Sequence, residues 1–123
     1  RSIMNTKIAE YHVCLLRCSD NSLYTLSTKG NPDECIAHHN AGNGPPYTKG
    51  RRPVSLEASF YIGNDRYDAM AVAYAIRKLS KTFKERLCSG NKTNLDAVLS
   101  KGREMGPWLR ETFQKFEANK RLD

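Results

Sequence analysis

The sequence predicts one small α/β domain, of the α+β kind, in which helices pack on a short antiparallel sheet. The chain has 123 residues, which are enough for one compact domain and too few for two. Apolar residues make up 39% of them, which suffices for a core. The periodicity of the apolar residues gives the order strand, strand, helix, strand and then helices.

Alternating apolar residues predict three strands. They cover residues 11–17, 23–28 and 54–62. The first two form a hairpin, because the turn cluster at residues 19–22 lies between them. One face of the first strand carries Tyr11, Val13 and Leu15, and one face of the third carries Leu56, Ala58, Phe60 and Ile62. Residues 1–10 are polar and are expected to be a loosely held arm.

Helical periodicity and start signals predict the helices. They cover residues 31–40, 65–79, 80–88, 94–101 and 107–119. Asn31 and Ser80 are capping residues, and Pro32 suits the first helical position. The glycine- and proline-rich segment 41–46 ends the first helix, and a short basic loop follows it. The stripe of the second helix carries Tyr67, Met70, Ala71, Tyr74 and Lys78. Residues 11–88 thus form the domain, and 89–123 a C-terminal helical extension.

The charge balance favours a polyanionic partner. Lys and Arg number 20 against 13 Asp and Glu, so the formal net charge is +7. Nucleic acid suits such an excess because binding releases counterions, although a merely solvated basic surface is the plainer alternative. No apolar run has the length that crosses a bilayer, so no membrane partner is expected.

Cysteine usage indicates a reducing compartment. The four cysteines have no regular spacing. If Cys14 and Cys18 share a strand, their Cα atoms lie about 13 Å apart, whereas a disulfide needs roughly 7 Å or less. The first residue is Arg1 rather than methionine, which fits removal of an organellar presequence and fits a trimmed chain equally well.

Several sequence blocks, in one consistent order, resemble a known family. They are residues 13–18, 22–25, 37–42, 47–53 and 73–80. Over residues 11–87 the chain resembles the GIY-YIG nuclease domain, in particular its small stand-alone members and the endonuclease subunit that cuts branched DNA. The resemblance implies a three-stranded antiparallel sheet flanked by helices. It also implies metal-assisted hydrolysis of a phosphodiester.

The family's catalytic side chains are mostly replaced in this sequence. The family uses two tyrosines on the first two strands, an arginine on the first helix and a metal-binding glutamate on a later helix. The matching positions hold Cys14, Tyr24, Cys35 and Ala73, with His39 as a frequent companion. The glycine of the second motif is Leu26. Because every ~1.4 kcal/mol of lost transition-state stabilisation is tenfold in rate, we expect no cleavage and no catalytic residues.

The residues that would bind nucleic acid remain. They are Tyr47, Lys49, Arg51 and Arg52 in the basic loop, and Arg77, Lys78, Lys81 and Lys84 on the later helices. Arg and Lys suit phosphate contacts, and Tyr47 could stack on a base. The alternative is that Tyr47 and Arg52 only pack the loop against the sheet.

No cofactor or metal is expected, although one zinc site stays open. By the family alignment, Cys14 and Cys35 point into the vacated cleft, where His39 could join them as a ligand. The alternative is that the two small side chains fill the space, with His39 hydrogen-bonded in place. The stripe of Trp108, Leu109, Phe113 and Phe116 is expected to be core or a protein-docking face.

These observations predict a catalytically inactive GIY-YIG-like domain that binds nucleic acid, RNA rather than DNA. We expect it to be a structural part of a large ribonucleoprotein, and an organellar, mitochondrial ribosome is the favoured setting. One alternative is a divergent metal-dependent, structure-specific endonuclease that uses Tyr24 and His39, with Glu57 or Asp68 as the metal ligand. A third is a protein-binding scaffold subunit.

Overall fold

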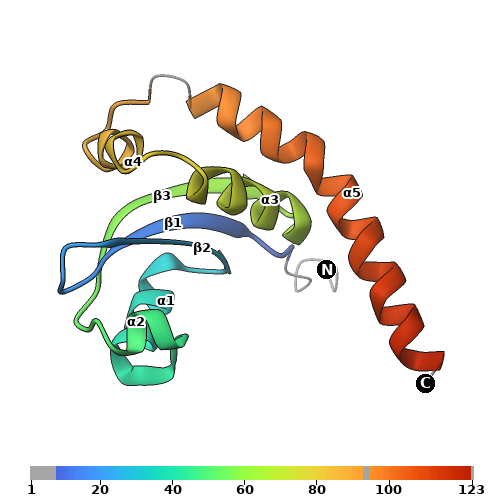
Figure 1. Ribbon diagram of the computed structural model, residues 1–123, viewed down its shortest axis with the longest axis horizontal. Coiled ribbons are helices and arrows are strands. Elements are labelled where there is room, and N and C mark those ends of the chain that lie inside the picture. The colour runs from blue at the N-terminus through green and yellow to red at the C-terminus, as the bar shows by residue number, and fades with distance from the viewer. Residues whose placement is uncertain (1–7, 93–94, 123) are drawn as a thin grey trace, which may run out of the picture.

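A three-stranded antiparallel sheet in the order β2-β1-β3 is the centre of the fold (Figure 1). The strands are β1 (Tyr11–Arg17), β2 (Leu23–Lys29) and β3 (Ser55–Gly63). The computed structural model describes residues 8–92 and 95–122. Most of the predicted arm at residues 1–10 lies outside the described residues. The predicted sheet and its hairpin are confirmed.

Helices cover both faces of this sheet. On one side lie α1 (Pro32–His38), the π-helical turn η2 (His39–Asn43) and α2 (Pro46–Lys49). On the other side lie α3 (Arg66–Arg77) and α4 (Lys81–Cys88), and α5 (Leu95–Leu122) packs across α3 (Figure 1). The two predicted caps are confirmed, because Asn31 accepts a hydrogen bond from the Asp33 amide and Ser80 accepts one from the Phe83 amide. No helix among the described residues has the length and apolar character that a membrane crossing requires.

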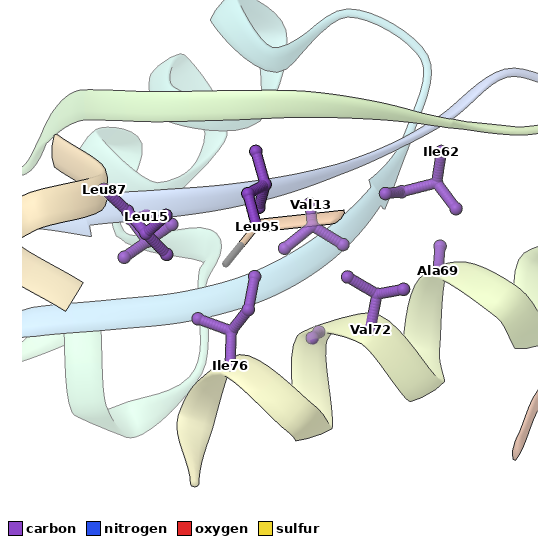
Figure 2. Packing of buried hydrophobic residues seen from close by; sticks show 9 residues of the cluster. Val13, Leu15, Ile62, Ala69, Val72, Ile76, Leu87 and Leu95 are labelled. Carbon is purple, nitrogen blue, oxygen red and sulfur yellow. The ribbon is translucent and has the colours of Figure 1, made fainter. Parts of the chain in front are cut away.

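Both faces of β1 are buried, so the sheet separates two apolar clusters. The α3-side cluster (Figure 2) comprises Val13, Leu15, Ile62, Ala69, Val72, Ala73, Ile76, Leu87 and Leu95. The α1-side cluster comprises Cys14, Leu16, Cys18 and Val54, with Tyr24, Leu26, Ile36 and Leu56 packed against it. Alternation along β1 therefore sends successive side chains into different clusters, as a strand requires.

A register shift in β3 corrects one predicted face. Ala58 pairs with Leu15, but Leu56 pairs with the next residue, Leu16, because the register shifts between Leu15 and Leu16. A bulge of this kind changes which side of the sheet the following residues face. Leu56 therefore packs in the α1-side cluster and not with Ala58, Phe60 and Ile62.

The helical extension differs from its prediction. One helix, α5, runs from Leu95 to Leu122 with Pro107 inside it, where two helices were predicted. The break was predicted because proline removes a backbone hydrogen bond, but tertiary packing can outweigh this local penalty. The glycines before Pro107 provide that packing: a Cβ at Gly102 would lie 2.8 Å from the Cα of Val72 on α3. Asn94, the predicted first residue, lies outside the described residues.

Two other local predictions need correction. The segment after Pro45 begins the short helix α2 and is not only a loop, because proline is tolerated in the first helical turn. The predicted stripe of α3 is not the face on the sheet. Ala69, Val72 and Ile76 face the core, while Met70 and Tyr74 turn toward α5.

Candidate functional site

The position that the resemblance matches to a first-strand tyrosine is closed. Cys14 on β1 has no exposed surface, and Leu26 on the neighbouring strand pairs with it across the hairpin. Burial, and secondarily the nearby Cys35, raises the pKa of the Cys14 thiol to about 12. Burial also raises the pKa of Cys35, although a hydrogen bond with Thr28 opposes this effect. Both thiols therefore stay protonated at neutral pH and offer no anionic ligand or nucleophile.

Tyr24, His39, Tyr47 and Arg51 form a column of neighbouring side chains beside the closed position. The rings of Tyr24 and Tyr47 stack with centroids 5.3 Å apart, and the Tyr24 ring lies 6.3 Å from that of His39. The guanidinium of Arg51 caps the column 3.8 Å above the Tyr47 ring. The structure thus brings together Tyr24 and His39, which the resemblance matches to catalytic positions, and two of the predicted binding residues.

A hydrogen bond to Thr48 fixes His39. The Nδ1 atom of His39 lies 2.9 Å from the Thr48 hydroxyl, which in turn donates to the carbonyl of Pro45 at 3.3 Å. Burial lowers the pKa of His39, and the neighbouring His38 lowers it further. A Cβ at Gly44 would lie 2.6 Å from Nδ1, so this position needs glycine.

The position that the resemblance matches to a metal-binding glutamate lies in a different environment. Ala73 on α3 is fully buried in the α3-side cluster, on the opposite side of the sheet from Cys14. Across residues 8–92 and 95–122, no three His, Cys, Asp or Glu side chains gather as a metal site requires. Cys14, Cys35 and His39 do not form such a group among these described residues, and His39 is hydrogen-bonded to Thr48.

Contacts within the protein occupy most of the basic loop. Arg51 pairs with Asp20 at 2.9 Å and donates to the carbonyl of Tyr47 at 3.0 Å. Arg52 donates to the carbonyl of Lys49 at 3.0 Å and to that of Asn40 at 3.4 Å. These contacts are the kind expected if the loop residues pack against the rest of the protein. Lys49 itself is exposed.

The second group of cations lies on the other side of the sheet. Arg77 donates to the carbonyl of Thr25 at 3.1 Å, and Lys78 lies 5.1 Å above the ring of Tyr74. On α4, Lys81 is exposed and Lys84 is half-exposed. Since α2 and α4 flank opposite faces of the sheet, the predicted binding residues form two separate groups (Figure 1).

Comparison with known proteins identifies the family. No family model matches the chain. A UPF0213 protein of Natronomonas pharaonis is 39% identical over 83 residues, which cover 64% of this chain and 91% of that protein. A UPF0213 protein of Staphylococcus haemolyticus is 40% identical over 80 residues, which cover 65% of this chain and 95% of that protein. The chain belongs to the UPF0213 family. The solution structure of a UPF0213 protein from Bacillus halodurans is 35% identical, covers 70% of this chain and 96% of that one, and gives a TM-score of 0.41.

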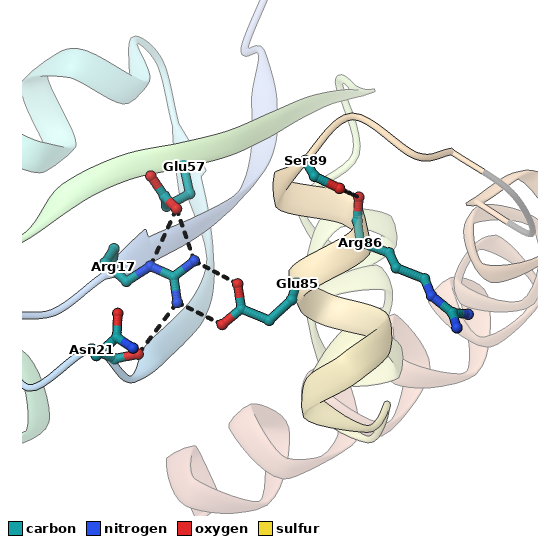
Figure 3. A network of polar contacts seen from close by, with 6 residues as sticks. All are labelled: Arg17, Asn21, Glu57, Glu85, Arg86 and Ser89. Atoms are coloured by element: carbon teal, nitrogen blue, oxygen red, sulfur yellow. Dashed lines mark hydrogen bonds and ion pairs between the residues drawn. The ribbon is translucent and has the colours of Figure 1, made fainter.

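An arginine network in this UPF0213 protein was missed by sequence reasoning. Arg17 at the end of β1 pairs with Glu57 of β3 at 2.8 Å and with Glu85 of α4 at 2.6 Å (Figure 3). Arg17 also donates to the carbonyl of Asn21 in the β1–β2 turn at 3.3 Å. The network fastens α4 to the sheet. No sequence signal identifies it, because its members lie 40 and 68 residues apart.

A groove between α3 and α5 was also missed as a site. A pocket of about 500 Å³ opens there, lined by Ser27, Met70, Ala71, Tyr74, Arg77, Met105, Trp108, Leu109 and Phe113. The sequence signal was present in two aromatic stripes, one on each helix. Only folding shows that the stripes face each other. Trp108 and Phe113 thus line a shared surface, whereas the exposed Phe116 is not among the lining residues.

Proposed function

We propose that this UPF0213 protein is a catalytically inactive GIY-YIG-like domain that binds RNA within a larger ribonucleoprotein. The closed cleft carries the proposal. Where the resemblance implies a tyrosine that activates water, Cys14 has no exposed surface and lies in an apolar cluster. A group without access to solvent or substrate cannot accept a proton from attacking water.

The remaining catalytic requirements also lack their side chains. Cleavage needs a fixed cation near the phosphate and a hard oxygen ligand for the metal. Cys35 offers a protonated thiol in place of the cation, and Ala73 offers a buried methyl group in place of the carboxylate. Removal of one such electrostatic group typically lowers kcat by about 100- to 1000-fold, so their joint loss supports inactivity.

Charge supports a nucleic-acid partner. The net charge of +7 favours a polyanion, and Lys49, Lys81 and Lys84 are available for phosphate contacts. Because these lysines lie on both sides of the sheet, they suit a ligand that surrounds the domain. Folded RNA in a ribonucleoprotein does so, whereas one straight DNA duplex contacts a single side.

A mitochondrial ribosome stays the favoured setting for this role. It rests on the basic charge and the lost chemistry, and it predicts that the protein sediments with ribosomal subunits from isolated mitochondria. Ribonuclease treatment should release the protein from those subunits. Its absence from the ribosomal fractions, or recovery of the complex after ribonuclease digestion, would refute this setting.

The first experiment incubates the purified protein with labelled structured RNA and branched DNA in the presence of Mn²⁺. We expect a mobility shift without cleavage, with RNA bound more tightly than DNA. Cleavage that Tyr24→Phe abolishes would refute inactivity. Of the carboxylates that such a nuclease would need, Glu57 pairs with Arg17, and Asp68 lies beside Gly106 of α5.

Charge-matched variants test the binding surface. Lys49→Gln, Lys81→Gln and Lys84→Gln are combined in one protein. We expect at least about tenfold weaker RNA binding, and a salt dependence whose slope falls by about 0.7 for each lysine that no longer neutralises a phosphate. The control combines Lys92→Gln, Lys115→Gln and Lys120→Gln, exposed lysines outside the two groups, and removes the same charge. Equal weakening by both variants would show that only net charge acts, and would refute the surface.

A further inference from the structure

Three adjoining pockets form one long groove beside α3. The pocket of about 500 Å³ between α3 and α5 shares Tyr74 and Met105 with a second pocket of about 430 Å³. It shares Ser27 and Met70 with a third of about 530 Å³, which reaches the end of β2. The groove thus runs along α3 from the start of the helix to its last turn.

The floor of the groove is apolar and adaptable. Met70, Met105 and Leu109 line it together with the rings of Tyr74 and Trp108. Trp108 is 61% exposed and Tyr74 is 46% exposed, although both are large side chains. Contiguous exposed apolar surface of this kind marks interaction sites, and methionine side chains adapt to varied apolar partners.

The rim of the groove carries only one sign of charge. Its cations are Lys29, Arg66, Arg77, Lys78 and Lys101. Among the described residues that line the three pockets, none is Asp or Glu. An occupant therefore needs apolar groups for the floor and negative charges beside them.

We propose that this groove binds an acidic amphipathic helix of a partner protein. An amphipathic helix places apolar residues at i, i+3, i+4 and i+7 on one face and leaves its flanks free for carboxylates. The apolar floor reaches from Met70 to Arg77, which are seven residues apart on α3, so this floor follows about 10 Å of that helix, or roughly two turns. Two turns of a partner helix present three or four anchors over that length.

A nucleobase fits this groove less well than an apolar side chain. Aromatic rings can stack on bases, but the polar edges of a base also need hydrogen-bond partners when they are buried. In the pocket of about 500 Å³, the floor consists of aliphatic, thioether and aromatic groups, with Ser27 and Arg77 as its polar lining. A second copy of this chain is disfavoured too, because each copy carries a net charge of +7.

The protein contains its own reporter for this groove. Trp108 is the single tryptophan of the chain and lines the groove. The probe is a synthetic helical peptide of about 16 residues with leucines on one face, glutamates on both flanks and no tryptophan. We expect its binding to move the emission of Trp108 to shorter wavelength, because the indole leaves water. Higher salt should weaken the effect.

Variants and rival ligands decide the proposal. In fluorescence anisotropy with the labelled peptide, Tyr74→Ala and Trp108→Ala should each weaken binding about tenfold. Phe116→Ala is the matched control, since Phe116 is 58% exposed on the same helix but does not line the groove. Equal loss in the control variant, or equal binding of the peptide with lysines in place of glutamates, would overturn the proposal. A response to oligouridine that displaces the peptide, or a shift caused by self-association alone, would overturn it as well.

Discussion

The contact between α5 and α3 depends on a glycine, which gives a sharp prediction. A Cβ at Gly102 would lie 2.8 Å from the Cα and 2.9 Å from the amide nitrogen of Val72, and these backbone atoms cannot rotate away. Gly102→Ala must therefore push α5 off α3. Overpacking typically costs about 1–3 kcal/mol, whereas alanine favours the helix by about 1 kcal/mol relative to glycine. Because the clash is with backbone atoms, the cost lies in the upper part of that range, about 2–3 kcal/mol, and we expect a net loss of about 1–2 kcal/mol in the free energy of unfolding.

Gly106 provides the matched comparison for this prediction. The nearest atom to a Cβ at Gly106 belongs to the side-chain carboxylate of Asp68, which can rotate, and the Cα of Asp68 lies 3.3 Å away. Gly106→Ala should therefore change stability by less than about 0.5 kcal/mol, because the gain in helix propensity offsets a smaller clash. Urea unfolding followed by circular dichroism measures both variants. An unchanged or raised stability of Gly102→Ala would refute the described packing of α5.

Three further predictions concern ionisable groups. Iodoacetamide at pH 8 should leave Cys14 unmodified in the folded protein, because burial raises its pKa to about 12, and should modify the half-exposed Cys88 faster. Burial lowers the pKa of His39, so on acidification the unfolded state binds a proton at this imidazole before the folded state does. The free energy of unfolding should therefore fall as the pH drops below about 6.5, and His39→Gln should remove this loss. The hydrogen bond from Arg17 lowers the pKa of Glu85 in the folded protein. The stability that this ion pair contributes is therefore present above about pH 4.5 and is lost as the pH falls through the pKa of Glu85 in the folded state. Glu85→Gln should reduce this loss of stability in acid.

Each of these predictions has a result that contradicts it. Peptide mass analysis that finds Cys14 labelled as fast as Cys88 would show that the cleft is open. A His39 imidazole whose NMR resonance titrates above pH 6.5 would contradict its burial. Acid unfolding curves that coincide for the wild type and Glu85→Gln would mean that the ion pair with Arg17 adds nothing, as exposed pairs often do.

Local signals predicted the elements whose cause is local. Asn31 and Ser80 begin their helices as their capping chemistry requires, and the alternation of β1 assigns its residues to the correct faces. The face of Leu56 was mispredicted because a register shift depends on the partner strand. The break expected before Pro107 was wrong because Gly102 packs on Val72, a contact between residues 30 positions apart. Tertiary contacts of this kind leave no trace in the periodicity.

The candidate site divides in the same way. The resemblance of short blocks predicted catalytic positions at Cys14 and Cys35, but the burial of Cys14 became visible only in the structure. Residue type alone assigned Arg51 to phosphate binding. Its stacking on Tyr47 and its pair with Asp20, which lies 31 residues earlier, could not be inferred from type or spacing.

Closure of one side of the sheet changes which surfaces of the domain can act. On the α1 side, Cys14 and Leu16 are fully buried, and Arg51 packs on the ring of Tyr47 in the loop. These residues of the α1 side therefore serve the packing of the domain. On the α3 side, Ala73 is buried and has no carboxylate. The next residue of the same helix, Tyr74, points outward and lines the groove. A buried alanine lets α3 pack closely on the sheet, which leaves its opposite face free to pair with α5. A buried alanine at position 73 and the groove are thus compatible on one helix, and the proposed binding of a partner helix can be measured separately from the proposed RNA binding by Lys49, Lys81 and Lys84.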